Sequence, residues 1–485
     1  MIVVVWTVIA LGLHRCSIQL PDTDEDVAEP AEEHNGEEES AAKSEVPFDE
    51  NVRILLMNQA YQGICHAELH ISCEEGFSVS YDQDQKTTDY PPDTELVLYP
   101  RDFKDNPMIC ITGKNDGRIE ILNLGRNSPA SYRGKLECYA AAEGIVVVNE
   151  LSVEEYLYGV VPSEMPSAYP DEAQKAQAIS ARTYTYFHKQ SYAYPEWRAH
   201  MDDSTAFQVY MNCEETPAAV KAVDETKGQV LTYDGEIVES FYYSTSGGYN
   251  GGARVWSDAA SAADDYLIET GEEIYASDSA EGEDAYRRYI DNGNEADVEY
   301  HDAWYRWDYD KMLEGDQVKK FLDQLYRLSQ SQPETVRIRS KYLSSDQLPG
   351  ENAISDIRVL DRKKSGLAAG IMIETEHFRV SVTSQYAVRQ ALGCAQDVVV
   401  KNDGSSYTMG DMLPSAYFYI EKIYDNNGEK GDNLKQVKIH GAGFGHGCGM
   451  SQNGAKGLAE RGLTAAQILA YYYNGSIMDI GELGK

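Results

Sequence analysis

The stretch Asn149-Glu-Leu-Ser-Val-Glu-Glu-Tyr-Leu-Tyr-Gly-Val-Val-Pro-Ser-Glu-Met-Pro166 runs directly into a segment with the pattern of a helix. Pro170 suits the first turn of that helix, and Asp171 and Glu172 complement the positive end of its dipole. Small, apolar or β-branched residues then recur at helical spacing at Ala173, Ala176, Ile179, Thr183 and Phe187. The pattern therefore predicts a helix that begins near Pro170.

Glu164 is the first candidate for chemistry in this stretch. It follows an apolar Gly-Val-Val run and precedes Met165 and Pro166, so we expect it in a turn ahead of the helix. An acid among apolar groups can have a raised pKa, which a general acid needs at neutral pH. The alternative is an ordinary glutamate on the protein surface.

Short apolar runs separated by Gly, Asp, Asn and Pro predict strands on both sides of the helix. These runs are Val52–Leu56, Ala67–Ile71, Glu95–Tyr99, Arg118–Leu122, Ile145–Val148, Gln229–Tyr233, Val238–Ser244, Thr335–Arg339, Ile354–Leu360 and Gly370–Thr375. Strands and helices are mixed without βαβ regularity, which indicates an α+β fold. We expect a β-rich N-terminal region at 51–129 and a mixed α/β domain at 130–480.

The net charge is strongly negative but unevenly distributed. The 485 residues include 42 Lys and Arg against 80 Asp and Glu, a net charge of −38. Residues 21–50 hold 13 acids and one Lys, and residues 257–316 hold 19 acids and four bases. So acidic a chain would repel nucleic acids and anionic membrane surfaces. The segment 257–316 contains Trp304 and Trp307, so we interpret it as a partly ordered insertion.

The N-terminus indicates export. Residues 1–20 begin with an apolar run from Met1 to Leu13, too short for a bilayer span of roughly 20 residues. The run matches the apolar part of a secretory signal, although the usual basic start is missing. We therefore expect an export signal or a membrane anchor, and the alternatives are acylation at Cys16 or a buried strand. The acidic segment 21–50 is expected to be a disordered spacer, so the membrane would be contacted only through the N-terminus.

Two further blocks carry candidate ligand contacts. Phe241-Tyr-Tyr-Ser-Thr-Ser-Gly-Gly248 joins aromatic rings to hydroxyls, which suits carbohydrate, although a polar exit from a strand would look the same. The segment from Gly441 to Gly454 holds six glycines in 14 residues around His446. It matches neither the Walker A motif nor the dinucleotide-binding motif. His446 could instead be a hydrogen-bonded core residue.

The eight cysteines show no metal-ligand spacing. No C-x-x-C pair occurs, which excludes zinc-ribbon and thioredoxin-like sites. In an exported chain Cys65 and Cys73 could form a disulfide, and free buried thiols are the alternative.

Taken together and in this order, the blocks resemble the SpoIID/LytB family, typified by a cell-wall lytic transglycosylase of spore-forming bacteria. The resemblance covers about residues 130–256 and 335–478. The matching stretches are Tyr156 to Pro166, Glu172 to Tyr184, Thr226-Lys-Gly228, Ser244 to Gly248, Gly443 to Gln452 and Ile468 to Gly475.

The resemblance implies roles for particular residues. Glu164, in the Glu-Met-Pro motif, would be the catalytic acid. The expected substrate-binding residues are Arg182, Gln208, Tyr210, Tyr243, Ser246, His446 and Gln452. Some relatives hold zinc near the segment His200 to Tyr210. Because the second Cys and second His are absent here, we predict no metal and no cofactor.

The resemblance also implies an activity. A lytic transglycosylase cleaves the bond between N-acetylmuramic acid and N-acetylglucosamine and forms a 1,6-anhydro end. One acid suffices, because the muramic 6-hydroxyl replaces the second carboxylate of most glycosidases. The expected partners are peptidoglycan strands and a cell-wall amidase, outside the cytoplasm. The alternative is a non-catalytic glycan-binding protein that enhances an amidase.

Overall fold

The computed structural model describes residues 50–483 apart from residues 60, 82–86, 105, 127–129, 257–260, 270–279, 341–352 and 426–432. The export signal expected at 1–20 and the spacer expected at 21–50, except for Glu50, lie outside the described residues. None of the described helices is long and apolar enough to cross a membrane.

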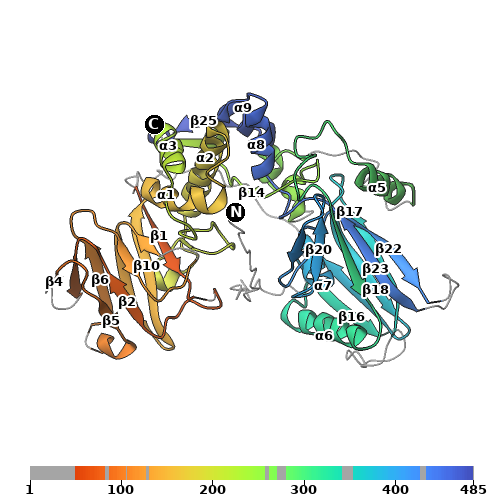
Figure 1. Cartoon of the computed structure of the whole chain (residues 1–485), viewed down its shortest axis with the longest axis horizontal. Coiled ribbons are helices and arrows are strands. Elements are labelled where there is room, and N and C mark those ends of the chain that lie inside the picture. The colour runs from red at the N-terminus through yellow and green to blue at the C-terminus, as the bar shows by residue number, and fades with distance from the viewer. Residues whose placement is uncertain are drawn as a thin grey trace, which may run out of the picture.

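The N-terminal body is built from two sheets (Figure 1). The larger sheet has the order β11 (Met201–Asp202), β1 (Asn51–Leu56), β10 (Gly144–Ser152), β9 (Lys135–Ala141), β6 (Met108–Gly113), β3 (Phe77–Tyr81) and β4 (Thr87–Tyr90). The smaller sheet has the order β5 (Leu96–Leu98), β2 (Leu69–Ser72), β7 (Ile119–Ile121) and β8 (Ser131–Tyr132). Their apolar residues share one buried core with the helices that follow, and the larger sheet includes β9, β10 and β11, which lie beyond residue 129.

Three helices come after β10: α1 (Val153–Glu164), α2 (Asp171–His188) and α3 (Pro217–Glu225). The helix expected from Pro170 is α2. The expectation that Glu164 lies in a turn ahead of a helix is wrong, because Glu164 is the last residue of α1. Pro162 usually signals a helix end. In α1, only Ser163 and Glu164 follow Pro162. Ser163 Oγ donates to the Gly159 carbonyl at 2.6 Å.

The second body also contains two sheets (Figure 1). One has the order β21 (Ser406–Thr408), β20 (Val398–Lys401), β15 (Trp307–Met312), β23 (Leu434–Gly441) and β22 (Phe418–Tyr424). The other has the order β16 (Val336–Ser340), β19 (Phe378–Thr383), β18 (Ala368–Thr375) and β17 (Ile354–Arg362). The helices of this body are α5 (Ala280–Asn292), α6 (Asp316–Ser331) and α7 (Gln385–Leu392).

The acidic segment expected as an insertion at 257–316 supplies the central strand of the five-stranded sheet. Strand β15 pairs antiparallel with β23 on one side and β20 on the other. Its residues alternate between buried and exposed, with Trp307 and Tyr309 in the core. The end of this segment is therefore integral to the second body.

The C-terminal segment returns to the first body. Strand β24 (Met450–Ser451) pairs parallel with β14 (Tyr242–Tyr243). Strand β25 (Ser476–Asp479) pairs with β12 (Gln229–Tyr233), which also pairs with β13 (Glu236–Ile237). Between them, α8 (Gln452–Glu460) and α9 (Ala465–Tyr472) lie beside α2 (Figure 1). A capping box formed by Thr464 and Gln467 begins α9. Helices and several sheets together confirm the α+β fold class.

Two residues expected to bind substrate lie in the core instead. Arg182 is fully buried and pairs with Glu154 on α1, with N–O distances of 2.8 and 2.9 Å. Its guanidinium also donates to the carbonyls of Val223 and Gln229, at 3.1 and 3.3 Å. Arg182 therefore joins α1, α2, α3 and the start of β12.

Tyr210 is the second correction. It is 1% exposed, and its ring packs between those of Tyr132 and Tyr156 at centroid distances of 5.8 and 4.8 Å. Its hydroxyl donates to Asn149 Oδ1 at 2.9 Å. With the ring enclosed and the hydroxyl bonded, Tyr210 supports the packing of α1 on the sheet.

Arg182→Ala should lower the free energy of unfolding by about 3 kcal/mol, because it removes the cation that pairs with Glu154 and a donor to the carbonyls of Val223 and Gln229. Urea denaturation measures this change. The control Arg337→Ala removes an exposed arginine and should change stability by less than about 0.5 kcal/mol. Equal effects of the two substitutions would contradict the role given to Arg182.

Candidate active site

The carboxyl of Glu164 is held by groups from three distant segments. The Val209 backbone N–H donates to Oε1 at 2.7 Å, and Gln452 Nε2 donates to Oε2 at 3.3 Å. Burial raises the pKa of Glu164 to about 7, although the hydrogen bonds from Val209, Gln452 and Tyr242 act in the opposite direction. The residue as a whole keeps part of its surface accessible, and a pKa of about 7 leaves the acid half protonated near neutral pH.

A chain of hydrogen bonds supports Tyr242 beside this carboxyl. The Tyr242 hydroxyl donates to Gln208 Oε1 at 2.9 Å, and Gln208 Nε2 donates to Thr185 Oγ1 on α2 at 3.0 Å. Gln208 is expected to bind substrate, but it is fully buried behind Tyr242. It therefore positions the tyrosine rather than a ligand.

Sequence reasoning selected Tyr243, and the structure places its neighbour Tyr242 at the site. Adjacent residues of a strand point to opposite faces, so the aromatic pattern alone could not decide between them. Tyr243 is 5% exposed and its hydroxyl donates to Asn250 Oδ1. Tyr242 is the site residue that the sequence analysis missed.

His446 lies on the other side of β14 in a fixed protonation state. Its Nε2–H donates to the Tyr242 carbonyl at 2.9 Å, and its Nδ1 accepts from the Cys448 N–H at 3.1 Å. Burial lowers the pKa of His446 to about 4, so the ring is neutral at pH 7. The ring of Trp256, which is 44% exposed, lies 5.1 Å away. His446 thus anchors the glycine-rich loop through its hydrogen bonds, and its ring packs beside the exposed ring of Trp256. The hydrogen bonds fit the interpretation as a core residue, and the contact with Trp256 is compatible with the interpretation as a binding residue.

The glycines of this loop permit its close approach to β14. Gly449 has φ 75°, and a Cβ there would lie 1.9 Å from the Phe241 carbonyl oxygen. Gly445 has φ 117°, and a Cβ there would lie 2.8 Å from Tyr243 Cβ. Side chains at these positions would push the loop away from Glu164.

A second buried carboxyl, Glu299, lies beneath the same region. It accepts from the backbone N–H of Ser246 at 2.7 Å and from the hydroxyls of Ser246 and Ser451. Glu299 is 4% exposed, and burial raises its pKa to about 7. Ser246, expected to bind substrate, is therefore committed to an internal contact. Glu299 lies within the acidic segment 257–316, and nothing in the sequence distinguished it from the neighbouring acids.

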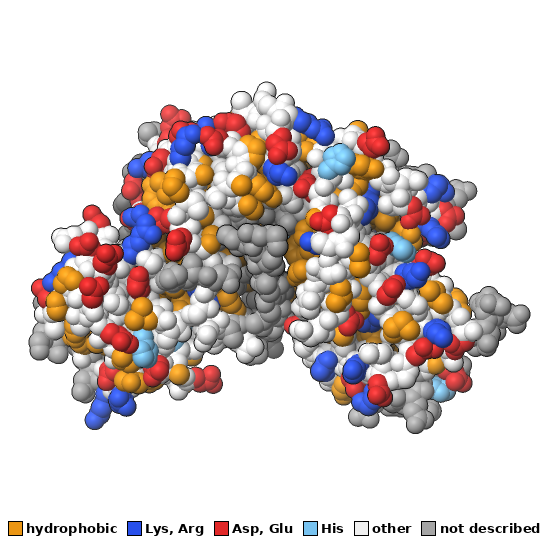
Figure 2. Space-filling view, in the orientation of Figure 1, with side chains coloured by type: hydrophobic (Ala, Val, Ile, Leu, Met, Phe, Trp, Pro, Cys, Tyr) orange, Lys and Arg blue, Asp and Glu red, His pale blue; other side chains and the backbone are white. Residues whose placement is uncertain are grey.

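Of the expected site residues, Gln452 bonds the Glu164 carboxyl directly. Gln208 and His446 are connected to it through Tyr242. Arg182, Tyr210, Tyr243 and Ser246 make internal contacts instead. Figure 2 shows acidic and basic side chains intermixed over the visible face of both bodies. On that face, charge alone does not identify the ligand surface.

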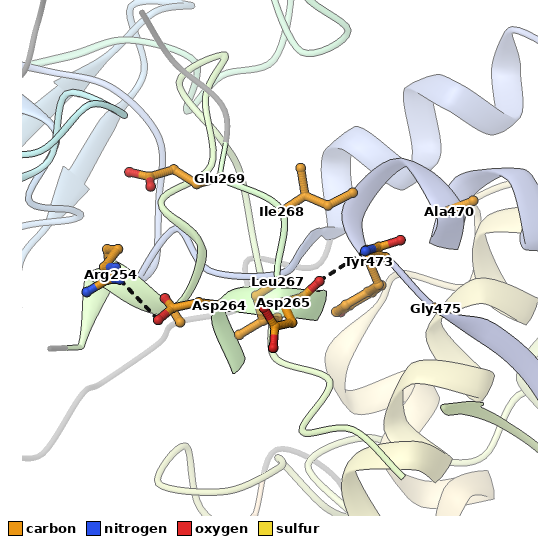
Figure 3. A pocket seen from close by; sticks show the side chains of 11 residues that line it. Arg254, Asp264, Asp265, Leu267, Ile268, Glu269, Ala470, Tyr473 and Gly475 are labelled. Carbon is orange, nitrogen blue, oxygen red and sulfur yellow. Dashed lines mark hydrogen bonds and ion pairs between the residues drawn. The ribbon is translucent and has the colours of Figure 1, made fainter. Parts of the chain in front are cut away.

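A cavity of about 600 Å³ lies apart from this carboxyl, beside α4 (Ala263–Tyr266) and the end of α9 (Figure 3). Arg254 pairs with Asp264 at 3.1 Å on one side, and Asn474 donates to the Asp265 carbonyl at 3.1 Å on the other. None of the candidate site residues lines it.

The histidine and cysteine near the segment considered for zinc make internal hydrogen bonds instead. Within the described part of the chain, no group of three His, Cys, Asp or Glu is arranged to hold a metal ion. Cys213 Sγ donates to the Pro162 carbonyl at 2.8 Å, and His200 Nδ1 accepts from the Arg53 N–H at 3.1 Å. Cys65 and Cys73 are free thiols, so the disulfide considered for them is not formed here.

Comparisons with known proteins agree with the motifs. Residues 141–233 match the family model described as stage II sporulation protein (SpoIID), and residues 262–449 match a domain of unknown function (DUF8618). The amidase enhancer of Bacillus subtilis (strain 168) is 27% identical over 328 residues, which are 66% of this chain and 40% of that protein. The chain therefore spans about two fifths of the length of that relative.

Two sporulation proteins are also similar. Stage II sporulation protein D of Bacillus amyloliquefaciens is 25% identical over 350 residues, which are 69% of this chain and 76% of that protein. Stage II sporulation protein D of Bacillus subtilis (strain 168) is 37% identical over 127 residues, which are 23% of this chain and 37% of that protein. Glu164 lies inside the matched segment 141–233, which is the part of the chain that is similar to the stage II sporulation protein (SpoIID) family.

Proposed function

We propose that this protein is an exported peptidoglycan lytic transglycosylase in which Glu164 is the general acid and base. The observation that carries the proposal is a partly exposed glutamate whose carboxyl has its pKa raised to about 7. The names of the relatives point to sporulation and to enhancement of an amidase, which suits action on the cell wall outside the cytoplasm.

One carboxyl can carry both proton transfers. Protonated Glu164 gives its proton to the oxygen that joins N-acetylmuramic acid to N-acetylglucosamine, and the glycosidic bond breaks. The 6-hydroxyl of the muramic sugar then attacks its own anomeric carbon and returns a proton to the Glu164 carboxylate. The sugar is left with a 1,6-anhydro ring. An internal nucleophile has a high effective concentration and requires no activated water.

The surroundings of Glu164 suit a mechanism with a single acid. The Val209 backbone N–H and the Gln452 amide donate hydrogen bonds to it, and among the described residues no other acid contributes to its raised pKa. Glu299 is sealed by two serines and cannot reach a glycan. Hydrolases usually place a second carboxylate opposite the acid.

The second candidate is a non-catalytic glycan-binding protein that enhances an amidase. The similarity to a protein named amidase enhancer favours it. A protein that only binds glycan has no need of a carboxyl with a pKa near neutrality. The raised pKa of Glu164 is the reason for preferring the enzyme.

The products of peptidoglycan digestion identify the reaction. The purified protein should release products with 1,6-anhydro-muramic ends from peptidoglycan, and Glu164→Gln should lower the yield by at least about a hundredfold, because the amide cannot supply a proton. Mass spectrometry of the digest detects the anhydro ends. Pelleting with cell walls should be unchanged in the variant.

Other outcomes of this digest distinguish the alternatives. Products with reducing ends would make the protein a hydrolase. Pelleting on cell walls without any products would favour the amidase enhancer. Glu172→Gln is a control, because Glu172 Oε2 accepts from the Ala465 N–H, away from the Glu164 carboxyl.

Activity should fall as the pH rises through about 7. The acid must be protonated to start the reaction, and burial raises the pKa of Glu164 to about 7. A profile of kcat/KM against pH should therefore be flat below about pH 6 and decrease tenfold per unit at high pH. A rate that increases through pH 7 would show that Glu164 does not act as an acid.

The same pKa predicts an effect on stability. When folding raises the pKa of a carboxyl, the carboxyl contributes stability at pH values below its ordinary pKa of 4.5. This contribution is lost as the pH rises through the folded pKa of about 7. Glu164→Gln should therefore unfold at higher urea concentration than the wild type at pH 8, with a gain of about 1 kcal/mol. At pH 4 the two proteins should be equally stable.

A further inference from the structure

Arg389, on α7 of the second body, is a buried cation without an acidic partner. It is 9% exposed, and it donates from Nε to the Leu413 carbonyl at 2.9 Å and from Nη2 to the Pro414 carbonyl at 3.0 Å. Among the described residues, no carboxylate pairs with it. Burying a guanidinium without a counter-charge is costly, and burial lowers the pKa of Arg389 to about 10.

One edge of the guanidinium remains available. Within the described residues, no acceptor bonds Nη1. Nη1 is also not one of the buried polar atoms that lack a partner, so it has some contact with solvent. The phenols of Tyr386, which is 40% exposed, and of half-buried Tyr407 are close enough to act on the charge. Because Nε and one N–H of Nη2 are the donors bonded within the described residues, an anion that reaches the guanidinium meets free N–H donors on both Nη1 and Nη2.

Arg389 is connected to the glycine-rich loop of the active site. The Pro414 carbonyl accepts from both Arg389 Nη2 and the Gly445 N–H, each at 3.0 Å. Gly445 precedes His446, and the charge of Arg389 contributes to the lowered pKa of that histidine. In Figure 1, α7 and β20 lie on the side of the second body that faces the first.

An aromatic surface extends from this cation along the same loop. Phe444 packs on Trp304 at a centroid distance of 4.5 Å, and Tyr407 lies 5.0 Å from Trp304 and 5.9 Å from Phe444. All three rings are half-buried. Aromatic faces beside polar groups suit the apolar faces of sugar rings.

We propose that Arg389, with Tyr386 and Tyr407, is a binding site for a single carboxylate of the wall polymer. This inference rests on the proposed function only for the identity of the polymer. A planar guanidinium edge matches a carboxylate through two parallel hydrogen bonds. A phosphate would bring a second negative charge, whereas this site offers a single cation, because the other ionisable groups coupled to Arg389 among the described residues are the two phenols and the neutral His446. A monoanion is therefore favoured.

Peptidoglycan offers two sources of such a carboxylate, the lactyl group of muramic acid and the end of a peptide. Isothermal titration of the Glu164→Gln protein, which cannot turn over, separates them. The probes are N-acetylmuramic acid, N-acetylglucosamine, D-alanyl-D-alanine and inorganic phosphate. We expect one carboxylate probe to bind at least about tenfold more tightly than N-acetylglucosamine and phosphate.

Substitutions assign the binding to this site. Arg389→Lys keeps a cation but loses the forked geometry, and should weaken the carboxylate probe about tenfold. Tyr386→Ala removes a ring on the surface and should weaken it about threefold without affecting folding. Arg379→Lys changes an exposed arginine of the same body and should have no effect.

Equal affinity for N-acetylmuramic acid and N-acetylglucosamine without binding of the dipeptide would overturn the proposal. Tighter binding of phosphate, or unchanged affinity in both Arg389→Lys and Tyr386→Ala, would also overturn it. These outcomes are independent of the cleavage assay. Anhydro products without carboxylate binding would reject only the Arg389 site, and the reverse result would reject only the lytic activity.

Discussion

The parallel pairing of β14 with β24 is the contact on which the active site depends. It aligns Tyr242 with Met450. Gln452 is thereby placed beside the carboxyl of Glu164, which lies 288 positions earlier in the chain. His446 bonds to the backbone of the same short strand. The second body lies between these two segments along the chain, so its folding must bring the ends of a long connection together. Without this pairing, Glu164 would lose one wall of its surroundings.

Enclosure of Glu164 opposes stability and favours chemistry. Protein atoms exclude water from the carboxyl and favour its neutral form, while a few hydrogen bonds keep the charged form attainable. The pKa of about 7 is the balance of these effects, and it suits a group that must both give and take a proton. Glu299 has the same raised pKa but is closed by serines. Accessibility therefore separates the candidate acid from a structural one.

Local patterns in the sequence predicted the elements well, because helix periodicity, caps and turn residues act over a few positions. The helix α2 and strand β12 lie where they were expected. Side-chain destinations were harder to predict. Arg182 resembles a binding residue in sequence, yet its partner Glu154 lies on a helix whose packing no local pattern reveals. The order of Tyr242 and Tyr243 depended on which face of a two-residue strand meets Glu164.

The most direct measurement is the pKa of the Glu164 carboxyl itself. Carbon-13 NMR of protein labelled at glutamate side-chain carboxyls can follow its titration, with the resonance assigned by its absence in Glu164→Gln. The account predicts a midpoint near 7, well above the ordinary value of 4.5. A midpoint at or below 4.5 would leave no acid at neutral pH and would contradict a lytic role for this site.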